Sequence, residues 1–350
     1  MLRPFKLTKH KIQKAQSFVN YIFLEIICRA PKLKENFPEF SSEMAGNYKT
    51  LLENTNHIHL LEPLKIIYRI VRNLPPKDIK TLRRAVLINN QIRKLCIGMH
   101  QPVSYKDLSL IDPTLSINIQ KFCYNLYKYI SKEKEFYEKY LTLKDYYQTI
   151  VDCDTTCYCC GIAPISNKYN TRRSPFDHFL PQAIYPFVSL NTHNLVPTCK
   201  DCNDVKWHKD TLYRNVSGSH SKQRIKTFYP FRYDVPDIKI QIDIQNNSNL
   251  SNIQPKDIEL QIDCKNHSQE VDNWKRMYDI ESRYKAELCS TNIKKNYEQY
   301  LFLRKAGIPH NKIIEAYEIN KYGDKNIIKI PLMECMNQKD LSSREKGFID

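Results

Sequence analysis

Apolar residues recur at helical spacing along the first part of the chain. One helix is predicted after Pro113, because five apolar residues follow at steps of four, three, four and three positions. They are Leu115, Ile119, Phe122, Leu126 and Tyr129. A second helix is predicted after Pro76, and a third within residues 49–73, broken near Pro63. Thr142 is the expected cap of a short helix that leads into a cysteine-rich segment.

The spacing of apolar residues changes in the last part of the chain. Isoleucine and leucine alternate with polar residues in 238–244 and again in 258–262, with a polar loop between the two runs. This pattern predicts two half-buried strands that form a hairpin. Helical spacing returns from 271 to 306 and predicts about two helices ending at Gly307, and 307–318 is a candidate for one more.

Charge and cysteine content narrow the choice of partner and compartment. The 54 Lys and Arg outnumber the 38 Asp and Glu, which gives a net charge of +16. This charge favours a nucleic-acid partner over the alternative that the chain is merely rich in lysine and has no binding face. The twelve cysteines are expected to be reduced thiols in the cytoplasm, because the N-terminal residues lack an apolar secretory signal. The apolar run 18–30 is too short and interrupted to span a membrane, so no membrane partner is expected.

Two C-x-x-C pairs define a candidate metal site. The pairs are Cys157 with Cys160 and Cys199 with Cys202. Four thiolates can surround one tetrahedral Zn²⁺ and leave no position for substrate, so the predicted zinc is structural. Cys153 and Cys159 compete for places in the first pair. The chosen pair is favoured because Gly161 follows it directly and eases a tight turn around a ligand.

The segment between the pairs carries the most specific pattern in the chain. Along the sequence, C-x-x-C-G is followed by D-H-x-x-P at 177–181 and by N-L-V-P-x-C-x-x-C-N-x-x-K at 194–206. In this order and spacing, residues 150–210 resemble HNH endonucleases of the ββα-metal (His-Me finger) superfamily, in the branch with a four-cysteine zinc site. The resemblance implies a zinc-bound ββα-metal module that hydrolyses phosphodiester bonds with a second, catalytic cation.

The resemblance assigns separate roles to the polar residues of this motif. His178 would be the general base that takes the proton of the attacking water. Asp177 and Asn203 would hold Mg²⁺ or Mn²⁺, which prefer oxygen ligands; the family often has histidine at the second of these positions. Asn194 would accept a hydrogen bond from His178 and fix the imidazole tautomer. His208 is a less favoured ligand, because a five-residue step from Asn203 leaves the same helix face.

Basic side chains on either side of the motif are candidate phosphate contacts. Arg172 and Arg173 precede the Asp-His pair, and Lys206 and Lys209 follow the second cysteine pair. A basic segment beside a nuclease centre suggests a groove for the nucleic-acid backbone. A solvated polar loop explains each of these residues, taken singly, nearly as well.

These observations predict an α+β, mainly helical protein. We expect a helical domain in 1–140, an HNH nuclease module in 141–235, and a β-hairpin with helices in 236–350. The preferred hypothesis is a cytoplasmic endonuclease with DNA as a more favoured substrate than RNA, in bacterial antiviral defence or a mobile element. Two alternatives stay open. One is a non-catalytic, zinc-dependent nucleic-acid-binding module. The other is an RNA-cleaving effector that becomes active when a partner protein docks on the helical domain.

Overall fold

The computed structural model describes residues 1–33, 57–130 and 142–346, apart from residues 154, 208, 217, 220, 233 and 246–251. His208 and residues 34–56 and 131–140 of the predicted N-terminal domain therefore lie outside the described residues. The chain is a mixed α/β protein, and because 54% of it is helical and its sheets are small, the mainly helical class is confirmed. No helix in the described part combines the length and the apolar composition needed to cross a bilayer.

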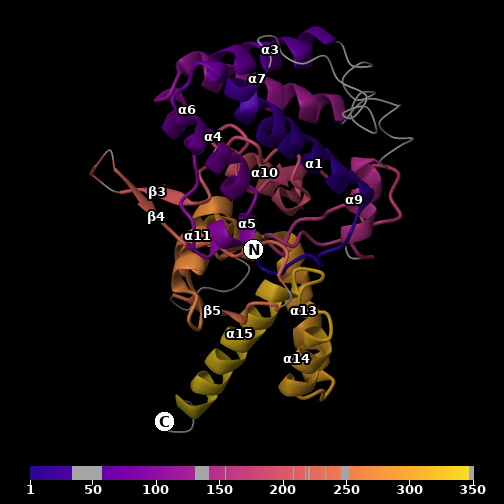
Figure 1. The fold of residues 1–350 in the computed structure, drawn as a ribbon. Coiled ribbons are helices and arrows are strands. Elements are labelled where there is room, and N and C mark those ends of the chain that lie inside the picture. Colours follow the sequence, from indigo (N-terminus) through magenta and orange to yellow (C-terminus); the bar gives the residue numbers. More distant parts are fainter. Residues whose placement is uncertain are drawn as a thin grey trace.

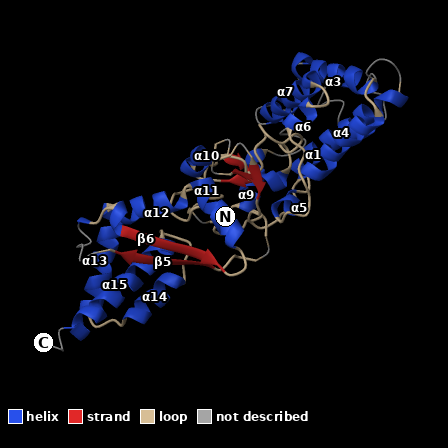
Figure 2. Ribbon diagram, turned by 90° about the vertical axis from the view of Figure 1, so that its left-hand side faces the viewer, coloured by secondary structure: helices blue, strands red, loops and turns tan. Residues whose placement is uncertain are grey.

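Three groups of elements follow one another along the molecule (Figures 1 and 2). Helices α1, α3, α4, α6 and α7 form one end, and the β5–β6 hairpin with α12–α15 forms the other. The strands β1 and β2 and helix α10 lie between these two ends (Figure 2). The cysteine-rich segment is therefore held between two helical groups.

The N-terminal group is built around α3 and α7, which pack against each other. Its helices are α1 (Lys14–Tyr21), α3 (His57–Arg72), α4 (Pro76–Asn89), α5 (Ile92–Cys96), α6 (Tyr105–Ser109), α7 (Pro113–Ile130) and α9 (Leu143–Ile150), with the shorter segments η1 (Lys11–Gln13), η2 (Ile22–Ile26) and η3 (Ile27–Lys32). Leu115, Ile119, Phe122 and Leu126 are buried, as the spacing after Pro113 predicts. Thr142 caps α9 and accepts a hydrogen bond from the backbone N–H of Asp145.

Helix α3 continues through Pro63, where the sequence predicts a break. Proline has no backbone N–H, so the carbonyl of His59 loses its usual partner in the helix. The side-chain Nδ2 of Asn125 in α7 donates to that carbonyl at 3.0 Å. A contact from the neighbouring helix thus replaces the missing bond, and the prediction of a break is wrong.

The central group contains two short hairpins and one helix. β1 (Phe176–His178) pairs antiparallel with β2 (Leu195–Pro197), after the short turn η4 (Thr192–Asn194), and α10 (Lys200–Lys206) follows β2 closely. The connection between β1 and β2 is tied to the N-terminal helices, because Nδ2 of Asn89 in α4 donates to the carbonyl of Pro186 at 3.1 Å. A second hairpin, β3 (Tyr213–Asn215) with β4 (Lys222–Arg224), projects from the body (Figure 1).

The C-terminal group begins with the predicted hairpin. β5 (Ile238–Ile244) pairs with β6 (Ile258–Cys264), which follows the turn η6 (Pro255–Asp257), and Ile240 lies opposite Ile262. The helices are α11 (Ser268–Tyr278), α12 (Ile280–Leu288), α13 (Thr291–Lys305), α14 (His310–Glu318) and α15 (Asn326–Lys346). Three helices replace the two expected in 271–306, because Asp279 adopts a left-handed conformation with φ of 49° and Ser290 caps a new helix.

Packing contacts join the three groups into one continuous hydrophobic core. The ring of Phe5 stacks on Tyr158 with 4.3 Å between centroids, and its backbone N–H donates to the carbonyl of Pro230 at 2.8 Å. The indole N–H of Trp274 in α11 donates to the carbonyl of Cys159 at 2.7 Å. Contacts therefore cross both predicted boundaries, at residues 140 and 235.

Candidate metal centre and candidate active site

Four buried cysteine side chains converge at the start of α10. The Sγ atoms of Cys157, Cys160, Cys199 and Cys202 all lie within 4.8 Å of one another. The Cys157–Cys202 and Cys160–Cys199 sulfur pairs are 4.0 and 3.9 Å apart. Sulfurs at about 2.3 Å from a tetrahedral Zn²⁺ would be about 3.8 Å apart, so the cluster could hold a single metal ion, and its all-thiolate donor set favours zinc.

The backbone conformation at each C-x-x-C pair directs its two Sγ atoms toward the centre of the cluster. Gly161 has φ of 70° and donates its N–H to the carbonyl of Cys157 at 2.8 Å. A Cβ at Gly161 would lie 2.5 Å from Cδ2 of Leu2, so a side chain does not fit. At the second pair, Cys199 is the N-cap of α10 and its Sγ accepts from the N–H of Cys202 at 3.3 Å. Backbone N–H groups at a helix N-terminus favour the thiolate form.

The two competing cysteines lie outside the four-sulfur cluster. Cys153 is exposed, and Cys159 is buried.

The backbone of the first pair is held by the C-terminal helices, since Tyr284 in α12 donates its hydroxyl to the carbonyl of Cys160 at 2.7 Å. The segment after residue 235 is thus part of the metal centre, which local sequence spacing does not indicate.

Arg283 in α12 contacts the sulfur cluster directly. Its Nη1 lies 3.2 Å from Sγ of Cys202, and its Nη2 lies 3.7 Å from Sγ of Cys160. Four thiolates and one Zn²⁺ carry a net charge of −2, which a guanidinium partly neutralises while it donates N–H groups to sulfur. Sequence reasoning misses this residue, because it lies far along the chain from either cysteine pair.

Arg283→Ala is expected to weaken zinc binding by about 10- to 100-fold, because the N–H···S contacts of the guanidinium and its positive charge are lost. Competition with a coloured zinc chelator measures the change. Lys285→Ala is the matched control, since it removes a positive charge from the same helix two residues away. Equal zinc affinity in the two variants would contradict the role given to Arg283.

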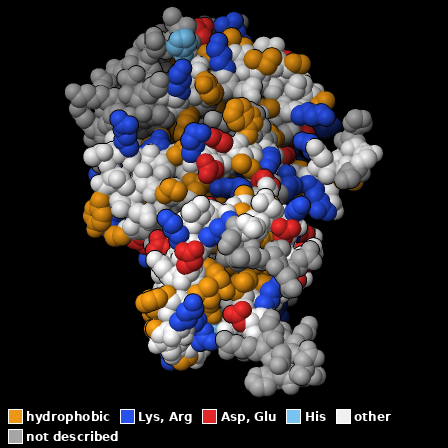
Figure 3. All heavy atoms as spheres, turned by 180° about the vertical axis from the view of Figure 1, so that it is seen from behind, with side chains coloured by type: hydrophobic (Ala, Val, Ile, Leu, Met, Phe, Trp, Pro, Cys, Tyr) orange, Lys and Arg blue, Asp and Glu red, His pale blue; other side chains and the backbone are white. Residues whose placement is uncertain are grey.

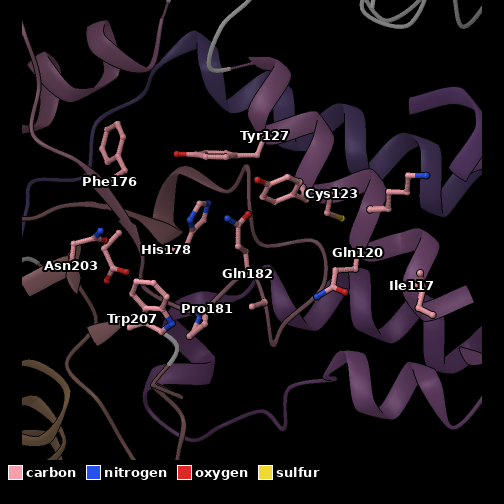
Figure 4. A pocket seen from close by; sticks show the side chains of 14 residues that line it. Ile117, Gln120, Cys123, Tyr127, Phe176, His178, Pro181, Gln182, Asn203 and Trp207 are labelled. Atoms are coloured by element: carbon pink, nitrogen blue, oxygen red, sulfur yellow. The ribbon is translucent and has the colours of Figure 1, made fainter. Parts of the chain in front are cut away.

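Three of the four residues predicted for catalysis and cation binding border one cavity of about 690 Å³. Asp177 and His178 reach it from β1, and Asn203 reaches it from α10. The opposite wall is a face of α7. Figure 4 shows His178, Gln182, Asn203, Trp207 and Tyr127 around the same space. The fold therefore brings together residues of the 177–181 and 194–206 motifs and adds a wall from α7 that neither motif contains.

His178 is oriented by a backbone carbonyl. Its Nε2 lies 3.1 Å from the carbonyl oxygen of Ser189, and a carbonyl only accepts, so Nε2 carries the proton and Nδ1 is the basic nitrogen. Burial lowers the pKa of His178 to about 4, the hydrogen bond to Ser189 opposes this shift, and the positive charge of Lys206 adds to it. The imidazole is therefore neutral at pH 7. The ring of Tyr127 meets it edge-on, with 4.6 Å between centroids.

Asn194 is buried but has other partners than predicted. Its Oδ1 accepts from the N–H of Leu180 at 2.6 Å, and its Nδ2 donates to the carbonyls of Leu180 at 3.0 Å and Val188 at 3.2 Å. These bonds hold both ends of the β1–β2 connection, which includes the carbonyl that orients His178. The expected side-chain bond from His178 to Asn194 is therefore replaced by the bond to Ser189.

Lys206 is buried against Asp177 and does not face solvent. Its Nζ lies 2.7 Å from Oδ1 of Asp177 and 2.7 Å from the carbonyl of His178, and the residue is only 1% exposed. A phosphate contact for Lys206, as predicted, would require it to leave this pair. Burial raises the pKa of the Asp177 carboxyl, and the charge of Lys206 opposes the shift.

The second carboxylate oxygen of Asp177 has no hydrogen-bond partner among the described residues. This oxygen, Oδ2, is also buried. A buried carboxylate oxygen without a donor is costly, and a cation is a fitting partner for it. Asn203 lines the same cavity and offers an amide oxygen. The donor set of Asp177 Oδ2 and Asn203 therefore fits the hard cation that the resemblance implies.

The other predicted phosphate contacts differ in exposure. Arg173 lies over the ring of Phe176, 4.9 Å from its centroid, and Lys209 donates its Nζ to the carbonyl of Arg276 at 3.0 Å. Arg172 is exposed. On the face shown in Figure 3, Lys and Arg side chains form separate groups interrupted by Asp and Glu rather than one continuous strip. Of the four predicted basic contacts, Arg172 alone is exposed, so it is the one that could reach a phosphate without a change in the fold.

No protein-family model matches the chain, and no curated protein or solved structure shows significant similarity to it.

Proposed function

We propose that the chain is a metal-dependent HNH-type endonuclease that hydrolyses phosphodiester bonds of nucleic acid, with DNA preferred, in the reducing cytoplasm. One observation carries the proposal. His178, Asp177 and Asn203 border the same cavity, directly beside a helix whose first turn carries two cysteines of the metal cluster. A histidine base, an oxygen donor set for a cation and a structural metal centre in this arrangement fit phosphodiester hydrolysis.

The residues of the cavity would have separate roles in the hydrolysis. His178 would accept the proton of the attacking water at Nδ1, since the bond from Nε2 to Ser189 keeps the other nitrogen protonated. Oδ2 of Asp177 and the amide of Asn203 would hold Mg²⁺ or Mn²⁺. The bound cation would neutralise the phosphate and the departing oxygen. Lys206 already pairs with Oδ1 of Asp177, and its positive charge would repel a metal cation at the same carboxylate. The cation would therefore bind more tightly when an anionic phosphate binds with it.

We expect two bound metal ions that differ in how easily a chelator removes them. Cleavage of plasmid DNA should stop after brief treatment with EDTA and return when Mg²⁺ or Mn²⁺ is added. The zinc content should stay at one ion per chain throughout, because four buried thiolates hold zinc far more tightly than two oxygen ligands hold Mg²⁺. Agarose gels and elemental analysis of the same samples measure both quantities. Cleavage that persists without added Mg²⁺ or Mn²⁺, or that returns with Zn²⁺ alone, would contradict the proposed division of roles.

A further inference from the structure

The cavity beside His178 has aromatic side chains that the proposed hydrolysis does not use. Trp207 and Tyr124 line it and are 69% and 55% exposed. Large aromatic rings that gather at the edge of a cavity and stay open to solvent are typical of a binding surface. Trp207 follows the last residue of α10 and has a positive φ of 40°, which bulky residues rarely adopt. The fold thus places this indole at the cavity in spite of an unfavourable backbone conformation.

A second observation points to a ligand with an N–H group. Oε1 of Gln182 is buried and has no hydrogen-bond partner among the described residues. Gln182 lines the same cavity, and Figure 4 shows its side chain beside His178. A buried amide oxygen without a donor is costly, so the site is incomplete until a donor enters it. Gln120 and Lys121 from α7 add an amide and a positive charge to the opposite wall.

We propose that this cavity receives one unpaired nucleobase of the substrate, stacked on Trp207 and donating an N–H of its Watson–Crick edge to Gln182. The inference rests on the proposed nuclease function and names the substrate class: single-stranded nucleic acid, or duplex with an unpaired nucleotide at the cut. Every base has an N–H on its Watson–Crick edge, and in a duplex the N–H that points along this edge is bonded to the partner base. A cavity of about 690 Å³ accepts one nucleotide but not an intact base pair within a double helix.

The tryptophan content of the chain allows a direct test of binding. The sequence has only two tryptophans, and Trp274 is buried at 2% exposure, so quenching by a stacked base reports on Trp207. The experiment uses the full chain with His178→Ala, which prevents cleavage. The probes are a non-self-complementary 12-nucleotide DNA strand, the RNA of the same sequence, and the corresponding 12-base-pair DNA duplex.

Both single strands, or one of them, should quench the fluorescence and bind at least tenfold more tightly than the duplex. The DNA and RNA arms then identify the sugar that the site prefers. Trp207→Ala, read by fluorescence anisotropy of a labelled strand, should weaken single-strand binding by about 5- to 150-fold, the range for loss of one base–aromatic stack. Gln182→Leu should also weaken it. Phe302→Ala is the control, because Phe302 is 72% exposed on α13, far from the cavity residues in sequence, and its loss should leave binding unchanged.

Equal affinity for the strand and the duplex, or no effect of Trp207→Ala, would overturn the inference. These results are separable from failure of the proposed function. Trp207-dependent binding of single strands by a chain that never cleaves them would support the base pocket and refute the nuclease. Cleavage of fully paired DNA that is unaffected by Trp207→Ala would support the nuclease and refute the pocket.

Discussion

Cys199→Ser is expected to release the zinc ion and unfold the central part of the molecule. Cys199 supplies one of four sulfurs within 4.8 Å of one another, and its Sγ also accepts the N–H of Cys202 at the start of α10. Serine caps helices well, so the substitution keeps the cap and removes the thiolate. Binding of a structural zinc is worth about 10–16 kcal/mol. This is as large as the whole stability of a typical domain, about 5–15 kcal/mol, so the loss of zinc should not be tolerated.

Elemental analysis and a thermal melt followed by circular dichroism measure this effect. The parent chain should contain one zinc ion, and Cys199→Ser should contain none and lose its cooperative transition. Cys153→Ser is the matched control, because Cys153 is exposed, four residues before Cys157 and outside the cluster. Full zinc content in Cys199→Ser, or zinc loss in Cys153→Ser, would show that the ligand set is wrong.

Lys206→Met is expected to lower the free energy of unfolding by about 3–5 kcal/mol, the usual cost of leaving one partner of a buried ion pair alone. Asp177 and Lys206 are 7% and 1% exposed at their side chains, and 2.7 Å separates their charged atoms. Without the ammonium, the buried carboxylate of Asp177 has no compensating charge from this helix. Asp177→Asn together with Lys206→Met should recover most of the loss, since neither charge then stays buried and unpaired.

The same helix offers a matched ion pair at the surface. Lys200 and Asp204 lie 2.6 Å apart, but Lys200 is 84% exposed at its side chain. Lys200→Met should therefore cost only about 0–1 kcal/mol. Urea unfolding of the parent and the three variants measures these differences. Equal losses for the two lysines, or no recovery in the double variant, would mean that the Asp177–Lys206 pair does not hold β1 to α10.

Structural features that are determined by residues close together in the sequence can be predicted from the sequence. The alternating isoleucines predict β5 and β6, and the spacing after Pro113 predicts the buried face of α7, because each pattern follows from the geometry of one element. The choice of the four cysteines is of the same kind. C-x-x-C spacing with a following glycine is a property of a short turn, and the structure brings the two turns together.

Structural features that depend on contacts between segments far apart in the chain cannot be predicted in this way. The partner of His178 is a backbone carbonyl, and every residue has one, so no side-chain identity marks Ser189. The sequence predicts a phosphate contact for Lys206, which instead pairs with Asp177, because the burial of this lysine is decided by how α10 packs on β1. Arg283 reaches the sulfurs from a helix that sequence patterns place in a separate C-terminal domain. In each case the deciding interaction is tertiary.

A comparison of two histidine variants decides whether His178 is the base of a nuclease centre. His193 lies in the same module, between β1 and β2, but its Nδ1 is 3.0 Å from the hydroxyl of Tyr229 and it does not line the cavity. Cleavage of single-stranded circular DNA and of supercoiled plasmid with Mg²⁺ or Mn²⁺ is measured for the parent, His178→Ala and His193→Ala, each with one zinc ion per chain. We predict that cleavage persists in His193→Ala and falls by at least 100-fold in His178→Ala, the lower end of about 10²–10⁴ for a general base. Equal cleavage by His178→Ala and the parent would contradict this prediction.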